Sequence, residues 1–296
     1  MTCTPAIAGV PALRAIAALV TCALLTSCAQ PPPAEPVPAR EAAAIAANHR
    51  AEAYFRQGDY EHAVPHYREA LRIAQSLEDA DGIAANAINL SIAYQRLGQS
   101  AEARASLAPV IDHGTRSFPP ARLAQVALRR SVLDFDERRY ASAGEWADQA
   151  AAYCRQQDCA LLGAIHNIKG RIALETGHSA SAAASAQAAL QASREAGNRV
   201  EIANALRLLG NAAIGSGDAK AARAPLGEAL AIDRELALPH RIYLDLVSLG
   251  RAAALGGERH AAQVYYQRAL AVSEADRDAQ GAAAARALID ALADKR

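Results

Sequence analysis

Cysteine has the most reactive side chain in this sequence, and its five copies fall into two groups. Cys3, Cys22 and Cys28 lie in the N-terminal segment, whereas Cys154 and Cys159 come much later and are separated by four residues. In an oxidising compartment the later pair is expected to form a disulfide, which for so short a loop stabilises the fold by about 2 kcal/mol. Free thiols or a redox sensor are the alternatives, and one cysteine pair is too few for zinc.

The residue types that enzymes use are present but are not arranged for catalysis. His62 and His66 are four residues apart and share one face of a predicted helix, yet no third metal ligand lies nearby in the sequence. The chain has no Gly-rich phosphate loop, no nucleophile elbow and no paired-histidine metalloprotease motif. We therefore expect ordinary surface histidines, no bound metal, no cofactor and no enzyme activity.

The N-terminal segment has the pattern of an export signal. Residues 15–25 form an uncharged apolar run behind Arg14 that is too short to span a bilayer. The run ends in Leu-Thr-Ser-Cys at residues 25–28, which resembles the lipobox of bacterial lipoproteins. The resemblance implies a signal peptide over residues 1–27 and lipidation of Cys28, and Ala29 favours the outer membrane, facing the periplasm. The alternatives are an ordinary secretory signal or a misplaced start codon.

A proline-rich stretch follows Cys28, and it predicts a tether over residues 28–43. Proline fixes its own backbone dihedral and lacks an amide donor, so this stretch is expected to adopt polyproline II rather than helix. At about 3.1 Å per residue, it would hold the folded part roughly 35 Å from the lipid surface.

The rest of the chain repeats with a period of about 40 residues. One column contains five glycines and one arginine at steps of 40, 40, 39, 40 and 40: Gly58, Gly98, Arg138, Gly177, Gly217 and Gly257. Five residues later comes an alanine column: Ala63, Ala103, Ala143, Ala182, Ala222 and Ala262. Seven residues before the glycine column all the residues are small: Ala51, Ser91, Ser131, Gly170, Gly210 and Gly250.

These columns predict helical hairpins. A small residue in mid-helix lets the second helix of a hairpin approach closely, and a glycine in the turn can adopt the left-handed conformation that ends a helix. Arg138 replaces that glycine in the third repeat, so the third repeat is expected to turn differently. Residues 280–294 add one more amphipathic helix, which is expected to cap the last repeat.

The repeat pattern resembles the tetratricopeptide repeat, most closely over residues 58–71, where Gly58, Asp59, Tyr60 and Ala63 begin the match. Its long period is similar to the extended subclass found in kinesin light chains and bacterial peptide-sensing regulators. The resemblance implies an all-α, right-handed solenoid of about six hairpins over residues 44–282, with longer helices and a C-terminal capping helix.

In tetratricopeptide proteins the first helix of each hairpin lines a concave groove that binds protein or peptide segments. Counting back from the turn column gives two groove-facing positions per repeat, and Phe135 enlarges the patch in the third repeat. The expected groove residues are Asn48 and Glu52, Ile88 and Ile92, Leu128, Val132 and Phe135, Asn167 and Arg171, Arg207 and Asn211, and Val247 and Arg251. The second and third repeats thus present apolar side chains, and the later repeats present Asn and Arg, which suit a peptide backbone and a carboxylate.

Charge and composition agree with a protein-binding role. Lys+Arg and Asp+Glu are balanced at 31 each, so nothing favours nucleic acid. We expect a lipid-anchored periplasmic scaffold or adaptor for cell-envelope assembly, with cell-wall enzymes or pilus or secretion components as partners. A peptide- or ligand-binding sensor is the alternative.

Overall fold

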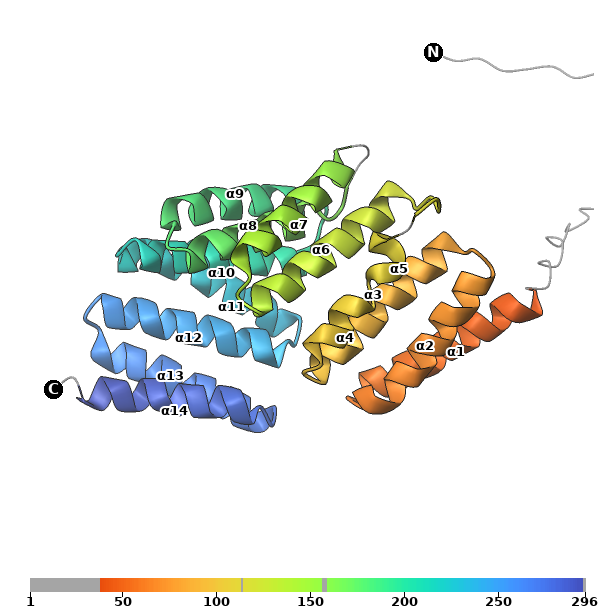
Figure 1. The fold of residues 1–296 in the computed structure, drawn as a ribbon. Coiled ribbons are helices and arrows are strands. Elements are labelled where there is room, and N and C mark those ends of the chain that lie inside the picture. Colours follow the sequence, from red (N-terminus) through yellow and green to blue (C-terminus); the bar gives the residue numbers. More distant parts are fainter. Residues whose placement is uncertain (1–37, 113, 156–158, 295–296) are drawn as a thin grey trace, which may run out of the picture. The chain divides into compact units, whose positions relative to one another are not determined.

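The computed structural model describes residues 38–112, 114–155 and 159–294, which are helical throughout apart from turns and short connections. Successive helices pack against one another as hairpins (Figure 1). The first helices of the hairpins are α1 (Ala39–Arg56), α3 (Ala80–Arg96), α6 (Pro120–Asp136), α8 (Leu162–Glu175), α10 (Arg199–Gly215) and α12 (Pro239–Leu255). The second helices are α2 (Tyr60–Ser76), the split pair α4 (Ser100–Ala105) and α5 (Ala108–Ile111), α7 (Tyr140–Cys154), α9 (Ser179–Glu195), α11 (Ala219–Glu235) and α13 (Arg259–Ala275). The predicted solenoid of six hairpins is confirmed.

The predicted small-residue columns lie where the helices touch. All six alanines of the alanine column have no exposed surface, as have Ala51, Ser91 and Ser131 of the small-residue column. At Gly210 an added Cβ atom would lie 2.4 Å from Cγ of Leu226, and at Gly250 it would lie 2.3 Å from the ring of Tyr266. Glycine is therefore required at these two positions by close packing of the second helix.

The turn column also has the predicted conformation, with one correction. Gly58, Gly177 and Gly257 have φ values of 78°, 81° and 77°. Arg138 adopts the same left-handed conformation with φ of 58°, so the third repeat turns like the others despite its side chain. The free energy gained by packing the two helices of the hairpin outweighs the cost of about 1 kcal/mol that this backbone conformation has for a non-glycine residue.

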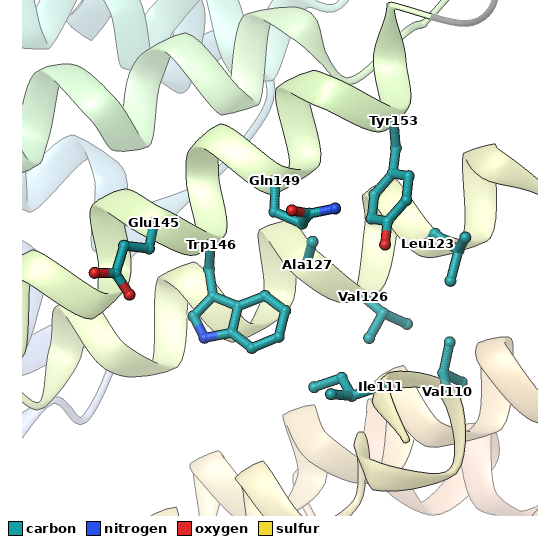
Figure 2. A pocket seen from close by; sticks show the side chains of 9 residues that line it. All are labelled: Val110, Ile111, Leu123, Val126, Ala127, Glu145, Trp146, Gln149 and Tyr153. Atoms are coloured by element: carbon teal, nitrogen blue, oxygen red, sulfur yellow. The ribbon is translucent and has the colours of Figure 1, made fainter. Parts of the chain in front are cut away.

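The second repeat departs from the pattern because its second helix is interrupted. Helix α4 ends at Ala105, α5 follows with Pro109 in its first turn and ends at Ile111, and Phe118 is buried in the connection to α6. The early end of α5 leaves a pocket between α5, α6 and α7 (Figure 2).

The helical region begins earlier than expected, whereas its last helix lies close to the expected range. Helix α1 begins at Ala39, directly after Pro38, so residues 39–43 are helical rather than part of the expected tether. A proline can precede a helix because the first helical amides have no intrahelical partner. Helix α14 (Ala279–Asp294) packs on α13 and covers Ala262 and Tyr266 with Leu288, Ile289 and Leu292, as a capping helix does.

Candidate functional site

Helices α3 and α6 lie side by side and leave a hollow of about 400 Å³ between them. Three of the predicted groove residues, Ile88 on α3 and Leu128 and Val132 on α6, line it together. The remaining lining residues are Ala85, Asn89, Arg122, Gln125, Arg129 and Leu161. We call this hollow the α3/α6 groove. Ile92 lies one turn further along α3 and is partly buried.

Arg129 is a groove residue that the sequence analysis missed. Its Nε donates to Oγ of Ser91 and its Nη2 donates to the Ser91 carbonyl oxygen, both at 3.0 Å. Burial lowers the pKa of Arg129 to about 10, so the guanidinium is charged at neutral pH. A guanidinium has five N–H groups, which leaves donors for an incoming carboxylate. The sequence could have indicated Arg129, because Arg122, Gln125 and Arg129 share one face of the helix, next to the two groove-facing positions chosen in each repeat.

Phe135, Asp136 and Arg171 form a polar cluster where α6 meets α8. The Arg171 guanidinium carbon lies 4.1 Å from the Phe135 ring centroid, and its Nη2 lies 4.0 Å from Oδ1 of Asp136. Burial lowers the pKa of Arg171 and raises the pKa of Asp136. Arginine stays charged under these conditions. Its side chain remains 48% exposed, so a second anion can reach it.

Two of the predicted groove residues instead hold neighbouring helices together. Asn167 is buried, and its Nδ2 donates to the carbonyl oxygen and to Oε2 of Glu201, at 3.1 and 2.7 Å. Arg207 leaves only 11% of its side chain exposed, because Nε donates to Oδ1 of Asp245 at 2.6 Å and Nη2 pairs with Asp233. The expectation that Arg207 meets a partner's carboxylate is therefore corrected: two aspartates of its own chain already occupy it.

Asn211 and Arg251 are the predicted groove residues of the last two repeats. Asn211 is partly buried and Arg251 is exposed. Within the residues that the structure describes, neither side chain makes a hydrogen bond or an ion pair. Their role in binding stays a prediction, because they lie outside the α3/α6 groove.

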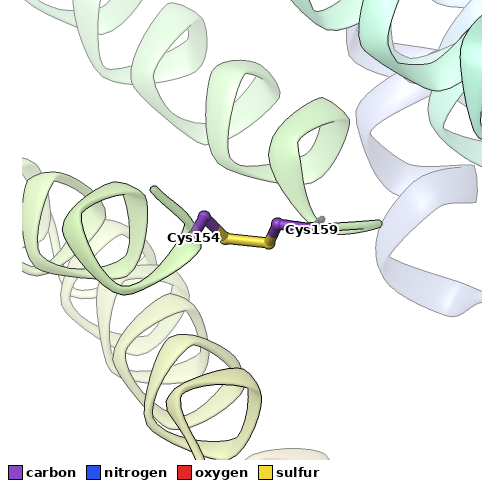
Figure 3. Close-up of a disulfide and its surroundings, with 2 residues drawn as sticks. All are labelled: Cys154 and Cys159. Atoms are coloured by element: carbon purple, nitrogen blue, oxygen red, sulfur yellow. A yellow bond between two sulfur atoms is a disulfide. The ribbon is translucent and has the colours of Figure 1, made fainter. Parts of the chain in front are cut away.

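Cys154 and Cys159 lie where the third repeat passes into the fourth. The structure joins them in a disulfide, with their Cα atoms 5.2 Å apart (Figure 3). Cys154 is the last residue of α7, and Cys159 lies two residues before Leu161. The bridge thus restrains the connection that supplies Leu161 to the α3/α6 groove.

The predicted signal peptide, the lipidated Cys28 and the tether before residue 38 lie outside the described residues. Within the part of the chain that is described, no helix combines the length and apolar character needed to cross a membrane.

Comparison with known proteins supports the architecture. Residues 42–108 match the family model described as tetratricopeptide repeat. No curated protein sequence matches the chain.

Three solved structures are similar in fold. BtubC from P. vanneervenii has a TM-score of 0.57 at 18% identity, covering 82% of this chain and 94% of that one. A Rap protein complexed with competence and sporulation factor has a TM-score of 0.62 at 13% identity, covering 85% and 71%. PilF of Pseudomonas aeruginosa has a TM-score of 0.54 at 17% identity, covering 84% and 98%.

Proposed function

We propose that this all-α solenoid, whose residues 42–108 match the tetratricopeptide-repeat model, is a scaffold that binds a polypeptide segment of a partner protein along the α3/α6 groove. Apolar side chains of the partner contact Ile88, Leu128 and Val132. A carboxylate of the partner, acidic or C-terminal, lies at Arg129 and Arg171.

One observation carries this proposal: apolar side chains line an open hollow that has arginines with unused donors beside it. Exposed apolar surface gains free energy when a partner covers it. A guanidinium that binds a carboxylate through two parallel hydrogen bonds adds direction to that contact. Arg129 keeps its orientation through its two bonds to Ser91, so little side-chain entropy is lost on binding.

The structures of similar fold are consistent with a binding role. The Rap structure is of a complex with competence and sporulation factor. A second structure of similar fold, PilW, is described as a type IV pilus biogenesis factor. We propose that this chain binds a polypeptide, and that no catalytic step follows.

We further propose that the scaffold is anchored at the periplasmic face of the outer membrane through acylated Cys28. Its partners would then be envelope proteins, such as cell-wall enzymes or pilus or secretion components. The lipobox-like residues 25–28 support this placement, and an oxidising periplasm suits the Cys154–Cys159 disulfide.

Crosslinking in intact cells followed by capture of the protein tests the groove. Leu128→Glu places a charge in the apolar hollow, and Arg171→Ala removes a half-exposed cation, so both variants should lose the crosslinked partner while remaining folded. Leu255→Glu and Arg194→Ala are matched controls, because Leu255 is 45% exposed outside the groove and Arg194 pairs with Glu228 on a different surface. The same partner at the same yield in all four variants would refute the proposed groove.

Palmitate labelling tests the anchor separately. Wild-type protein should incorporate label and fractionate with membranes, and Cys28→Ala should do neither. If the Cys28→Ala variant keeps its label, the proposed lipidation site is wrong, whatever the crosslinking result.

The sensor alternative makes a different prediction. A solenoid that signals by closing on a peptide changes its radius of gyration in X-ray scattering when the peptide is added. A scaffold with a preformed groove keeps the same radius.

A further inference from the structure

A second hollow, of about 350 Å³, lies on the side of α6 away from the α3/α6 groove (Figure 2). Helices α5, α6 and α7 line it, and we call it the outer pocket. Its lining residues are Val110, Ile111, Leu123, Val126, Ala127, Glu145, Trp146, Gln149 and Tyr153.

The outer pocket owes its character to the interrupted second repeat. Helices α9 and α11 also leave a hollow over α10, but Ala, Ser, Leu and Pro side chains line it. In the second repeat α5 ends at Ile111, and the large side chains of α7 face the space that remains. Two aromatic rings therefore line the pocket.

Three residues of α7 give the pocket its length. Trp146, Gln149 and Tyr153 follow the i, i+3, i+7 spacing of one helical face, and Figure 2 shows both rings beside the pocket with Gln149 between them. Seven helical residues span about 10.5 Å along the axis. An extended polypeptide covers that distance with about three residues. The Gln149 amide can both donate to and accept from a peptide backbone between the two rings.

The charge at one end of the pocket is negative. Glu145 is the only charged residue among those that line it, and its exposed carboxylate makes no hydrogen bond or ion pair within the described residues. The neighbouring Trp146 ring has the guanidinium of Arg130 5.5 Å from its centroid, and Arg130 pairs with Asp134, which also pairs with Arg139. Indole is the aromatic ring that attracts cations most strongly. The Tyr153 end is bounded by the apolar Leu123.

We propose that the outer pocket binds an extended segment of a partner polypeptide that carries an apolar residue and, two positions away, a basic residue. The apolar side chain lies against Leu123, Val126 and Tyr153. The basic side chain lies at Trp146 and Glu145, where charge and cation–π attraction act together. This site does not depend on the α3/α6 groove, because the two hollows use different faces of α6.

Trp146 is the only tryptophan in the chain, so its fluorescence reports on this pocket directly. The probes are the capped tripeptides acetyl-Leu-Ala-Arg-amide and acetyl-Leu-Ala-Glu-amide, titrated into the full-length protein. The arginine peptide should shift Trp146 emission to saturation, and the glutamate peptide should not. Glu145→Gln should weaken the arginine peptide by about three- to tenfold, as expected for one partly exposed charge contact.

Two further variants separate the pocket from general effects. Glu61→Gln makes the same change at an exposed glutamate of α2, far from the pocket lining, and should leave the titration unchanged. Tyr153→Ala removes one wall while keeping the Trp146 reporter and should abolish saturation. If Tyr153→Ala fails to fold, the exposed Glu145→Gln still decides the question.

Three outcomes would overturn the proposal. The first is no emission shift with the arginine peptide at millimolar concentration. The second is an equal emission shift with the arginine and glutamate peptides, or equal binding of the arginine peptide by Glu145→Gln and by the wild-type protein. The third is a tighter response to the small amine 4-phenylbutylamine than to the peptide, which would assign the pocket to free amines rather than to a polypeptide.

Discussion

At the scale of single residues, four non-glycine residues in the described part of the chain adopt left-handed backbone conformations. Arg138 has φ of 58° within the third hairpin, and Glu78, Ala237 and Arg277 have φ values between 52° and 59° in turns between hairpins. A Cβ atom is close to the following carbonyl oxygen in this conformation, which costs about 1 kcal/mol or more per residue. The other hairpins place glycine where Arg138 stands, so this residue carries strain that its neighbours avoid.

Replacing Arg138 by glycine should therefore stabilise the protein by up to about 1 kcal/mol. Glycine removes the free-energy cost of the left-handed conformation, but its greater flexibility also stabilises the unfolded chain and offsets part of the gain. Urea unfolding followed by circular dichroism measures the change. Arg50→Gly is the control, because Arg50 lies within α1, where the same substitution should destabilise the helix by about 1 kcal/mol. A loss of stability in Arg138→Gly would contradict the interpretation.

Arg207, Asp233 and Asp245 form a buried cluster of one positive and two potentially negative groups. They come from α10, α11 and α12, and neither aspartate has exposed surface. Oδ1 of Asp233 and Oδ2 of Asp245 have no hydrogen-bond partner within the described residues. Burial and the nearby Asp233 raise the pKa of Asp245 to about 7, although Arg207 opposes the shift. A proton on Asp245 would neutralise the cluster.

This raised pKa predicts that stability falls as pH rises. The folded state binds the proton more tightly than the unfolded state, so the stabilisation is complete below the unfolded pKa of about 4 and is lost as pH rises to about 7. The free energy of unfolding should decrease by about 1.4 kcal/mol per pH unit in this window from this group alone. Asp245→Asn cannot ionise and should remove this slope, measured by urea unfolding from pH 5 to pH 8.

Asp290→Asn serves as the comparison for that experiment, because Asp290 is exposed on α14. It should keep the wild-type slope. An unchanged slope in Asp245→Asn would show that the cluster does not take up a proton in this range.

Removing Arg207 from this cluster should destabilise the protein much more than removing Arg171. Arg207→Ala leaves two buried carboxylates without their partner and should destabilise the protein by about 3–5 kcal/mol. Arg171→Ala removes a half-exposed side chain and should cost about 1 kcal/mol or less. Thermal and urea unfolding of the two variants distinguish these roles, and equal losses would contradict the assignment.

At the scale of helices, the hairpins are held together by small residues at the contact between their two helices. Gly210 and Gly250 lie within α10 and α12, where glycine is unfavourable to the helix by about 1 kcal/mol relative to alanine. The close approach of Leu226 and Tyr266 outweighs this cost because larger side chains on the second helix can then bury more apolar surface.

Gly250→Ala should therefore destabilise the last hairpin by about 1–3 kcal/mol, since the Tyr266 ring must move to admit the Cβ atom. Gly144 and Gly227 provide the matched control, because they lie within α7 and α11 and an added Cβ atom at either would meet nothing within 4 Å. Gly144→Ala and Gly227→Ala should stabilise by up to about 1 kcal/mol. Urea unfolding of the three variants checks the difference in sign.

At the scale of the whole helical region, each hairpin buries its surface mainly against its sequence neighbours. After the sixth hairpin, α14 packs on α13 and covers its apolar side chains. From this helix, Leu288 packs against two clusters of buried residues to which α12 and α13 contribute. Stability of a repeat protein depends on such terminal caps, because an uncovered last repeat exposes its apolar face.

Leu288→Asp should therefore detach α14 and destabilise the last hairpin by about 2–4 kcal/mol, because a charge replaces a packed leucine. Hydrogen–deuterium exchange should show faster exchange in α13 and α14. Ala287→Asp is the control, because residue 287 is exposed on the same helix and should tolerate the charge. Slow exchange of α14 in Leu288→Asp would show that the cap does not depend on this contact.

The repeat architecture and its points of closest contact could be predicted from the residue pattern. Columns of glycine and alanine recur at fixed spacing because every hairpin needs a left-handed residue in its turn and small residues where its two helices touch. The apolar groove positions Ile88, Leu128 and Val132 followed from counting along one helical face, since helical periodicity relates residues of a single element.

The residue pattern could not predict which polar residues remain available for a partner, because this depends on contacts between helices. Arg171 and Arg207 are predicted groove residues of successive repeats, yet Asp233 and Asp245 bury Arg207 while Arg171 stays half exposed. Arg129 and the outer pocket were likewise missed, because they arise where side chains of different helices meet and where α5 ends early. Helical period fixes which face a residue occupies, but contacts from distant parts of the chain decide whether that face is already used.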